Sequence, residues 1–196
     1  MTPKRIFILD GHPAAQSLSR GLLQTYADRA RAAGHEVRIA HLHDLTFDPD
    51  FGAGNYENWK PLEPDLEHVL AQIEWSEHLV LAFPLWWGAM PARLKGVFDR
   101  AFLPGRAFDT RVTKMGMPTP MLGGRTARVI VTSDTPIWFL RLVYGNAVLR
   151  QTRGQILGFA GIKPTRFTLF SGASAPKPGA VDRWMKRIAR LGTAGA

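Results

Sequence analysis

Short apolar runs separated by helical patterns dominate the chain. Three of these runs, residues 6–9, 79–83 and 129–131, are continuous, which is typical of strands buried on both faces of a parallel sheet. Two others, residues 37–42 and 166–170, nearly alternate apolar and polar residues, which is typical of strands with one partly wet face. The pattern therefore predicts a five-stranded parallel sheet with the latter two runs at its edges.

Helical patterns follow each of the five predicted strands. The first helix carries residues at a spacing of four from Leu18 to Ala30, with Ser17 as its candidate N-cap and Gly34 as its C-terminal stop. Further helices are predicted over residues 64–75, 91–102, within 139–159 and over 181–191. Strands that alternate with helices, with the second and fifth strands at the edges, describe an α/β domain with the doubly wound order 2-1-3-4-5 and helices on both faces.

Length and composition favour one globular domain over residues 1–196, because 45% of the side chains are apolar. The chain has no Cys, which excludes disulfides, thiolate zinc sites and Fe–S clusters and favours the cytoplasm; no metal site is predicted. The longest uncharged run, residues 79–92, is shorter than the roughly 20 residues of a membrane span. The net charge of +9 suits anionic ligands, but no nucleic-acid-binding motif accompanies it.

The predicted order locates the site, since a doubly wound sheet binds ligands at the carboxyl ends of its strands, where the chain reverses direction. The first loop, after Leu9, lacks the glycine patterns of dinucleotide and ATP sites. It carries His12, Ser17 and Ser19 near a helix N-terminus, where a phosphate is stabilised. The alternative is that Ser17 is merely a helix cap and His12 a polar loop residue.

The loop after Phe83 contains two adjacent tryptophans, Trp86 and Trp87, between two prolines. Such a stiff, flat, apolar rim suits a planar aromatic ligand, although one tryptophan could instead pack in the core. The hydroxyl-rich loop from Thr132 to Thr135 could bond the polar edge of a ring, or be only a turn. A phosphate beside a planar ring indicates flavin mononucleotide.

These residues carry a family resemblance. Asp10-Gly-His12 with the two serines, and above all the stretch from Phe83 to Phe102, resemble the flavodoxin-like NAD(P)H:quinone oxidoreductases. The resemblance covers nearly the whole chain. It implies a flavodoxin-like fold and a homodimer that uses NADPH or NADH to reduce quinones or similar flat electrophiles through bound flavin, in a two-electron ping-pong reaction. Because the family also includes ancillary subunits of potassium-efflux systems, the alternative is a regulatory subunit that docks on a membrane transporter through the cationic last helix.

Carried over by position, the resemblance implies three groups of flavin-binding residues. The phosphate and ribityl region is bound by His12, Ser17, Leu18 and Ser19. The isoalloxazine ring is bordered by Pro84, Leu85, Trp86 and Trp87, and along its other edge by Thr132, Ser133, Asp134 and Thr135. Chain length favours FMN, with FAD as the alternative.

Two departures from the family bear on mechanism. Asp134 and Thr135 replace a Gly-Gly pair, and no His follows His78, so the relay histidine of longer members is missing. Tyr144 is then the predicted proton donor, with water as the alternative. Phe108 is the predicted substrate contact, on a segment, residues 104–125, that is either a mobile lid or a loop at the dimer edge.

Overall fold

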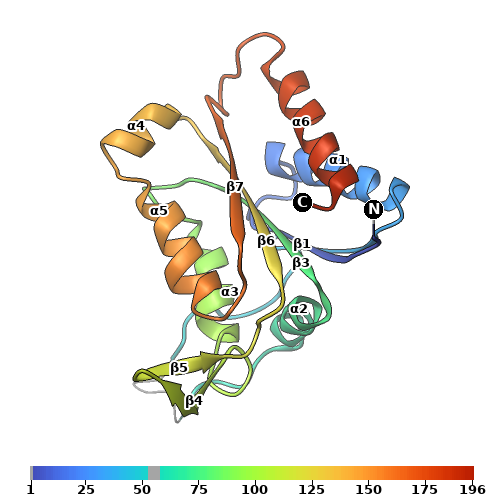
Figure 1. Ribbon diagram of the computed structural model, residues 1–196. Coiled ribbons are helices and arrows are strands. Elements are labelled where there is room, and N and C mark those ends of the chain that lie inside the picture. Colours follow the sequence, from blue (N-terminus) through green and yellow to red (C-terminus); the bar gives the residue numbers. More distant parts are fainter. Residues whose placement is uncertain (1, 53–57) are drawn as a thin grey trace.

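The computed structural model describes residues 2–52 and 58–196 (Figure 1). Its main sheet is parallel and has the order β2-β1-β3-β6-β7, which confirms the predicted doubly wound order. The strands of this sheet are β1 (Arg5–Asp10), β2 (Glu36–His41), β3 (His78–Pro84), β6 (Thr126–Ser133) and β7 (Thr165–Ser171). The helices are α1 (Leu18–Ala32), α2 (Pro64–Trp75), α3 (Ala92–Ala101), α4 (Ile137–Leu142), α5 (Ala147–Arg150), the π-helical η1 (Gln151–Gly158) and α6 (Ala180–Ala194).

Two apolar cores lie on opposite faces of the sheet. Successive side chains of a strand point to opposite faces, so Phe7 and Leu9 of β1 join the core under α2, α3, α5 and η1. Ile6 and Ile8 join the core under α1 and α6. The central strands are buried on both sides, as their continuous apolar runs predicted. Within residues 2–52 and 58–196, no helix combines the length and apolarity needed to cross a bilayer.

The region 139–159 differs from the single helix predicted there. The structure breaks it into α4, α5 and η1, because Gly145 and Asn146 both adopt left-handed backbone angles, with φ of 54° and 53°. Two left-handed residues in a row end α4 and redirect the chain. The break sets α4 apart from the other helices, at the upper left of Figure 1.

Residues 104–125, expected as a lid or loop, contain an antiparallel hairpin of β4 (Phe108–Lys114) and β5 (Met117–Pro120). Its two-residue turn uses Met115 and Gly116, with φ of 53° and 77°. Two positive φ values define the tight turn whose twist matches a hairpin. The hairpin lies beyond one end of the main sheet (Figure 1).

His78, at the start of β3, makes stability depend on pH. The ring is 3% exposed, and its Nδ1 lies 2.6 Å from the Thr126 hydroxyl. Burial, with Lys4 and Arg128 nearby, lowers its pKa from 6.5 to about 3. Between these two pH values the unfolded chain takes up a proton that the folded chain excludes. The free energy of unfolding should therefore fall with acidification below pH 6.5, by at most about 1.4 kcal/mol per pH unit from this group.

The variant His78→Asn isolates this contribution, because the amide retains a polar partner for Thr126 but does not titrate. Urea unfolding of both proteins between pH 4 and pH 6.5 should give a shallower pH dependence for the variant. Equal slopes would show that His78 is protonated in the folded chain as readily as in the unfolded one.

Candidate functional site

The first loop of the site is held by Asp10, whose side chain is 1% exposed at the end of β1. Its carboxylate accepts a hydrogen bond from the backbone N–H of His12 (3.2 Å), and its other oxygen lies 3.1 Å from Nδ1 of His41 on β2. The backbone N–H of Gly11 donates to the carbonyl of Ala82 on β3 (2.7 Å). These bonds fix the loop against both neighbouring strands. No pattern in the sequence indicated this positioning role of Asp10 and His41.

His12 presents one donor outward. The backbone N–H of Ala14 donates to its Nδ1 (3.0 Å), so in this geometry Nε2 carries the ring proton. The imidazole also contacts the indole of Trp86 edge-on, with ring centroids 5.7 Å apart. The predicted phosphate loop and the predicted ring-binding loop therefore touch.

The two predicted hydroxyls at the start of α1, those of Ser17 and Ser19, differ in their hydrogen bonding. Ser17 is the N-cap, and its Oγ accepts from the backbone N–H of Arg20 (3.0 Å). Ser19 is 1% exposed, and its Oγ has no hydrogen-bond partner. A buried hydroxyl without a partner is costly. Together with the unpaired N–H groups of the first helical turn, this hydroxyl suits an anionic ligand.

The tryptophan loop forms a tight turn at the carboxyl end of β3. Trp86 and Ala89 exchange both backbone hydrogen bonds at 2.9 Å. Between them Trp87 and Gly88 have φ of 50° and 76°, as in a two-residue hairpin turn. The side chain of Trp87 is fully exposed. A bulky residue in a left-handed conformation, with no packing to compensate for the strain, indicates a function other than stability.

A cavity of about 520 Å³ opens beside this turn. Its wall is mostly apolar and is formed by residues of β6, β7, α4 and α5 and of the loops after β3, β6 and α4. Its lining includes Leu85, Trp87, Val131, Thr135, Tyr144 and Asn146. The predicted residues Leu85, Trp87, Thr135 and Tyr144 thus share one cavity at the carboxyl ends of β3 and β6, and no residue of the loop after β1 lines it.

Several other predicted site residues do not line this cavity. Pro84 is buried at the end of β3, and Leu18 packs on the core beneath α1. Val131 lines the cavity, and because side chains alternate along β6, the side chain of the next residue, Thr132, points to the opposite face of the sheet. The backbone carbonyl of Thr132 accepts a hydrogen bond from the N–H of Leu85 (2.8 Å). The Oγ of Ser133 accepts from the N–H of Thr135 (3.0 Å), which shapes the loop.

Asp134 and Phe108 lie outside the cavity. The carboxylate of Asp134 accepts from the hydroxyl and the N–H of Ser174, both at 2.7 Å, and these bonds lower its pKa. It therefore ties the loops after β6 and β7 together. Phe108 packs edge-on against Phe159, with centroids 5.1 Å apart, in a second cavity of about 780 Å³ beside the hairpin. Within one chain it does not face the tryptophan loop's cavity.

A family profile described as a flavodoxin-like fold matches residues 4–191. The chain belongs to this family. The match includes all three loops of the site, the hairpin and most of α6, so the family extends over the whole sheet and its covering helices.

Several known proteins are similar to the chain over different lengths. An uncharacterized NAD(P)H oxidoreductase of Escherichia coli is 29% identical over 55% of this chain and 57% of its own length. The chain thus spans little more than half of that relative. A rat NAD(P)H dehydrogenase [quinone] 1 is 25% identical over 96% of this chain and 77% of its own. The crystal structure of an FMN-dependent NADH-azoreductase from Bacillus anthracis, in complex with FMN, shares the fold with a TM-score of 0.74 at 17% identity, over 97% of this chain and 98% of its own.

The residues present fit a flavin. The unpartnered Ser19 hydroxyl and the first turn of α1 offer donors for a phosphate. The mostly apolar cavity beside Trp87 offers a wall for a planar ring. The contact between His12 and Trp86 connects the loop proposed for the phosphate with the loop proposed for the ring. No cluster of three metal-ligating side chains occurs among the described residues.

Trp87 provides a test that separates binding from folding. Trp87→Asn places a residue that tolerates left-handed angles in the turn. We expect the flavin-free variant to be more stable by about 0.5–1 kcal/mol, because strain is relieved and no packing is lost. We also expect its Kd for FMN to rise about tenfold through loss of ring contact. Chemical denaturation and FMN titration measure the two effects.

The matched control is Trp138→Asn, since Trp138 is an exposed indole on the right-handed helix α4. This control should not gain stability. A loss of stability in Trp87→Asn would assign the Trp87 indole to packing instead of ligand contact.

Proposed function

We propose that the chain is a flavin-dependent NAD(P)H oxidoreductase that binds FMN and reduces quinones or similar flat electrophiles. One observation carries the proposal. The cavity has an apolar wall that includes the exposed, strained Trp87. Next to Trp87, Trp86 contacts His12 of the first loop, and this loop leads to the buried, unpartnered hydroxyl of Ser19. The relatives support the same chemistry, since two of them are named as NAD(P)H-dependent redox enzymes.

The chain's own groups have distinct tasks in this proposal. Ser19 Oγ, Nε2 of His12 and the first-turn N–H groups of α1 hold the phosphate. Leu85, Trp87 and Val131 hold the ring and exclude water from one of its sides. Bound FMN would supply two-electron transfer between the nicotinamide donor and the acceptor. Alignment of donor and acceptor against one fixed ring is the main contribution of the protein.

Tyr144 is the proposed proton donor. Its ring lines the cavity and packs edge-on against Phe139, with centroids 5.1 Å apart. The side chain is 55% exposed, so the hydroxyl can exchange its proton with water. In this proposal it replaces the histidine that longer family members carry.

The test is anaerobic spectroscopy of the FMN-loaded chain. Addition of NADPH or NADH should bleach the flavin absorbance, and addition of a quinone should restore it, with parallel lines in double-reciprocal steady-state plots. Apo-protein supplied with the same nucleotide is the control. A chain that binds FMN but is not reduced by either nucleotide would contradict the proposal.

The oligomeric state and compartment belong to the same proposal. We place the working form as a homodimer in the cytoplasm, supported by the exposed apolar side chains of the hairpin and the absence of Cys. In a dimer, Phe108 could face a neighbouring copy's site. Phe108→Ala should then raise the KM for a quinone without changing FMN affinity. An unchanged KM would assign Phe108 to packing against Phe159.

A further inference from the structure

The α4 patch is an exposed apolar surface that the proposed reaction does not use in full. It consists of Ile137, Trp138, Leu142, Val143 and Tyr144, which are between 42% and 75% exposed. Phe139 connects its aromatic members, because its ring contacts Trp138 at 5.4 Å and Tyr144 at 5.1 Å between centroids. Soluble domains seldom leave such a contiguous cluster in water without a partner for it.

The charged side chains of α4 and α5 are both positive. Arg141 lies within the patch and Arg150 follows one turn into the next helix, and both are exposed. Among the described residues neither arginine takes part in an ion pair. No acidic residue occurs between Asp134 and Asp182. The patch is therefore both apolar and cationic.

The same sign extends over half of the chain. Residues 110–196 contain fourteen Lys and Arg against two acidic residues, whereas residues 1–109 contain eleven against fourteen. This cationic part of the sequence comprises the hairpin, β6, β7 and the helices from α4 to α6, of which α6 packs beside α1 (Figure 1). Such separation of charge attracts and orients a molecule on an extended anionic surface.

We propose that the α4 patch docks the protein on an anionic lipid bilayer. Trp and Tyr favour the boundary between lipid tails and headgroups. Leu142, Val143 and Ile137 would enter the acyl boundary, while Arg141 and Arg150 meet lipid phosphates. Residues 110–196 carry fourteen Lys and Arg against two acidic residues, instead of a compact set of alternating charges, and this excess favours a lipid surface over a protein partner.

Docking would place the proposed flavin site at the membrane. Tyr144 belongs to the patch and also lines the 520 Å³ cavity, as do Leu140 and Asn146 nearby. An acceptor that leaves the bilayer at α4 thus reaches the cavity without crossing bulk water. This route for the acceptor rests on the proposed function. The substrates that it implies are quinones with long isoprenoid tails that reside in membranes.

Vesicle flotation of the full chain tests the docking itself. The chain should float with phosphatidylcholine vesicles that contain phosphatidylglycerol, should float less with phosphatidylcholine alone, and should be released by high salt. The double variant Trp138→Ser/Leu142→Ser and the variant Arg141→Glu should each lower the partition coefficient about tenfold. None of these three side chains lines the cavity, and all are exposed, so the variants should fold.

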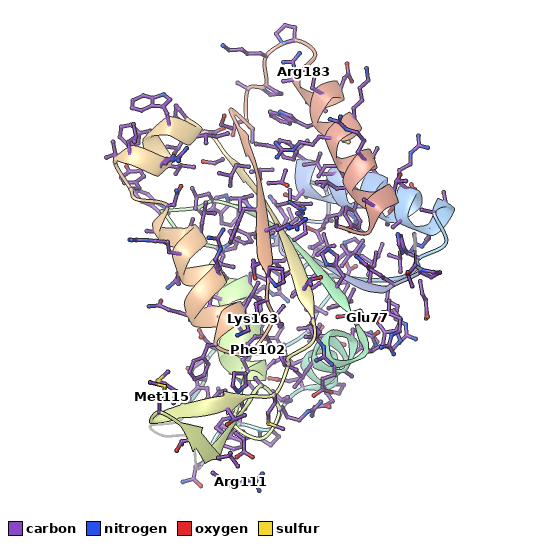
Figure 2. The ribbon with its side chains drawn as sticks, in the orientation of Figure 1. Glu77, Phe102, Arg111, Met115, Lys163 and Arg183 are labelled. Carbon is purple, nitrogen blue, oxygen red and sulfur yellow. The ribbon has the colours of Figure 1, made fainter. Side chains whose placement is uncertain are left out.

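Two matched controls change the same chemistry elsewhere. Met115→Ser removes an exposed apolar side chain at the hairpin, far from α4 (Figure 2). Arg29→Glu reverses an exposed charge on α1, in the other half of the chain. Both should bind vesicles like the wild type. Equal losses in the controls would show that binding is diffuse, and would overturn the assignment to α4.

Other outcomes also decide the proposal. It is overturned if no flotation occurs, if only membranes that contain protein capture the chain, or if the double variant changes the mass of the protein in solution, which would make the patch an interface between copies. In activity assays the double variant should slow reduction of a vesicle-embedded quinone and leave a water-soluble quinone unaffected. Flotation without NAD(P)H oxidation would refute the proposed function alone, and oxidation without flotation would refute the docking alone.

Discussion

Replacing Ser19 with alanine is expected to weaken FMN binding by tenfold or more while leaving the flavin-free chain at least as stable as the wild type. The hydroxyl is buried without a partner, so its removal ends an unfavourable burial in the apo-protein. A hydrogen bond from a hydroxyl to a charged phosphate contributes about 1.5–3 kcal/mol. Loss of that bond corresponds to about a tenfold to hundredfold rise in Kd.

Thr152→Val is the matched control for this prediction. Thr152 in η1 is also fully buried with an unpartnered hydroxyl, but η1 packs on the opposite face of the sheet from the first turn of α1. Its replacement should leave FMN affinity unchanged. Isothermal titration with FMN and urea unfolding supply both readouts. If Ser19→Ala binds FMN as tightly as the wild type, the phosphate lies elsewhere.

Arg100→Met is expected to destabilise the chain by about 3 kcal/mol, the largest effect on stability that we predict. Arg100 is 1% exposed, and its guanidinium bonds both carboxylate oxygens of Glu63 at 3.0 and 3.1 Å. It also donates to the backbone carbonyls of Asp48 (2.5 Å) and Pro61 (2.9 Å). The variant would leave these acceptors and a partly buried carboxylate without their donor.

The double variant Arg100→Met/Glu63→Leu removes the carboxylate as well, and should recover part of the lost stability. Urea unfolding of the wild type, both single variants and the double variant measures the coupling. FMN affinity of the folded protein should not change, because Arg100 lies outside the cavity. Additive effects of the two single changes would show that the pair contributes no specific interaction.

The sheet and the three loops of the site followed from local sequence pattern. Continuous apolar runs such as residues 79–83 predict central strands, because both faces of such a strand are buried. The half-alternating run at 37–42 predicts an edge. Once the order is known, the loops after β1, β3 and β6 must lie at one edge of the sheet. The cavity lined by Leu85, Trp87 and Thr135 lies at the ends of β3 and β6, and the loop after β1 contacts this region through His12 and Trp86.

Features set by long-range contacts or by backbone angles were not predictable in this way. The bond between Asp10 and His41 joins positions 31 residues apart, and no pattern in the sequence reports it. Asp134, a common turn residue, bonds Ser174 on the next loop. The break at Gly145 and Asn146 and the turn at Met115 depend on left-handed angles that their neighbours impose. Gly116, a residue that adopts left-handed angles without strain, was the available sequence signal for the hairpin turn.

Titration of the flavin-free chain with FMN, followed by flavin fluorescence, tests the central claim most directly. The cavity predicts saturable quenching at one flavin per chain, because an indole stacked on the ring quenches its emission, and it predicts weaker quenching in Trp87→Asn. Emission that stays at the level of free FMN throughout the titration would contradict the assignment of the cavity to a flavin.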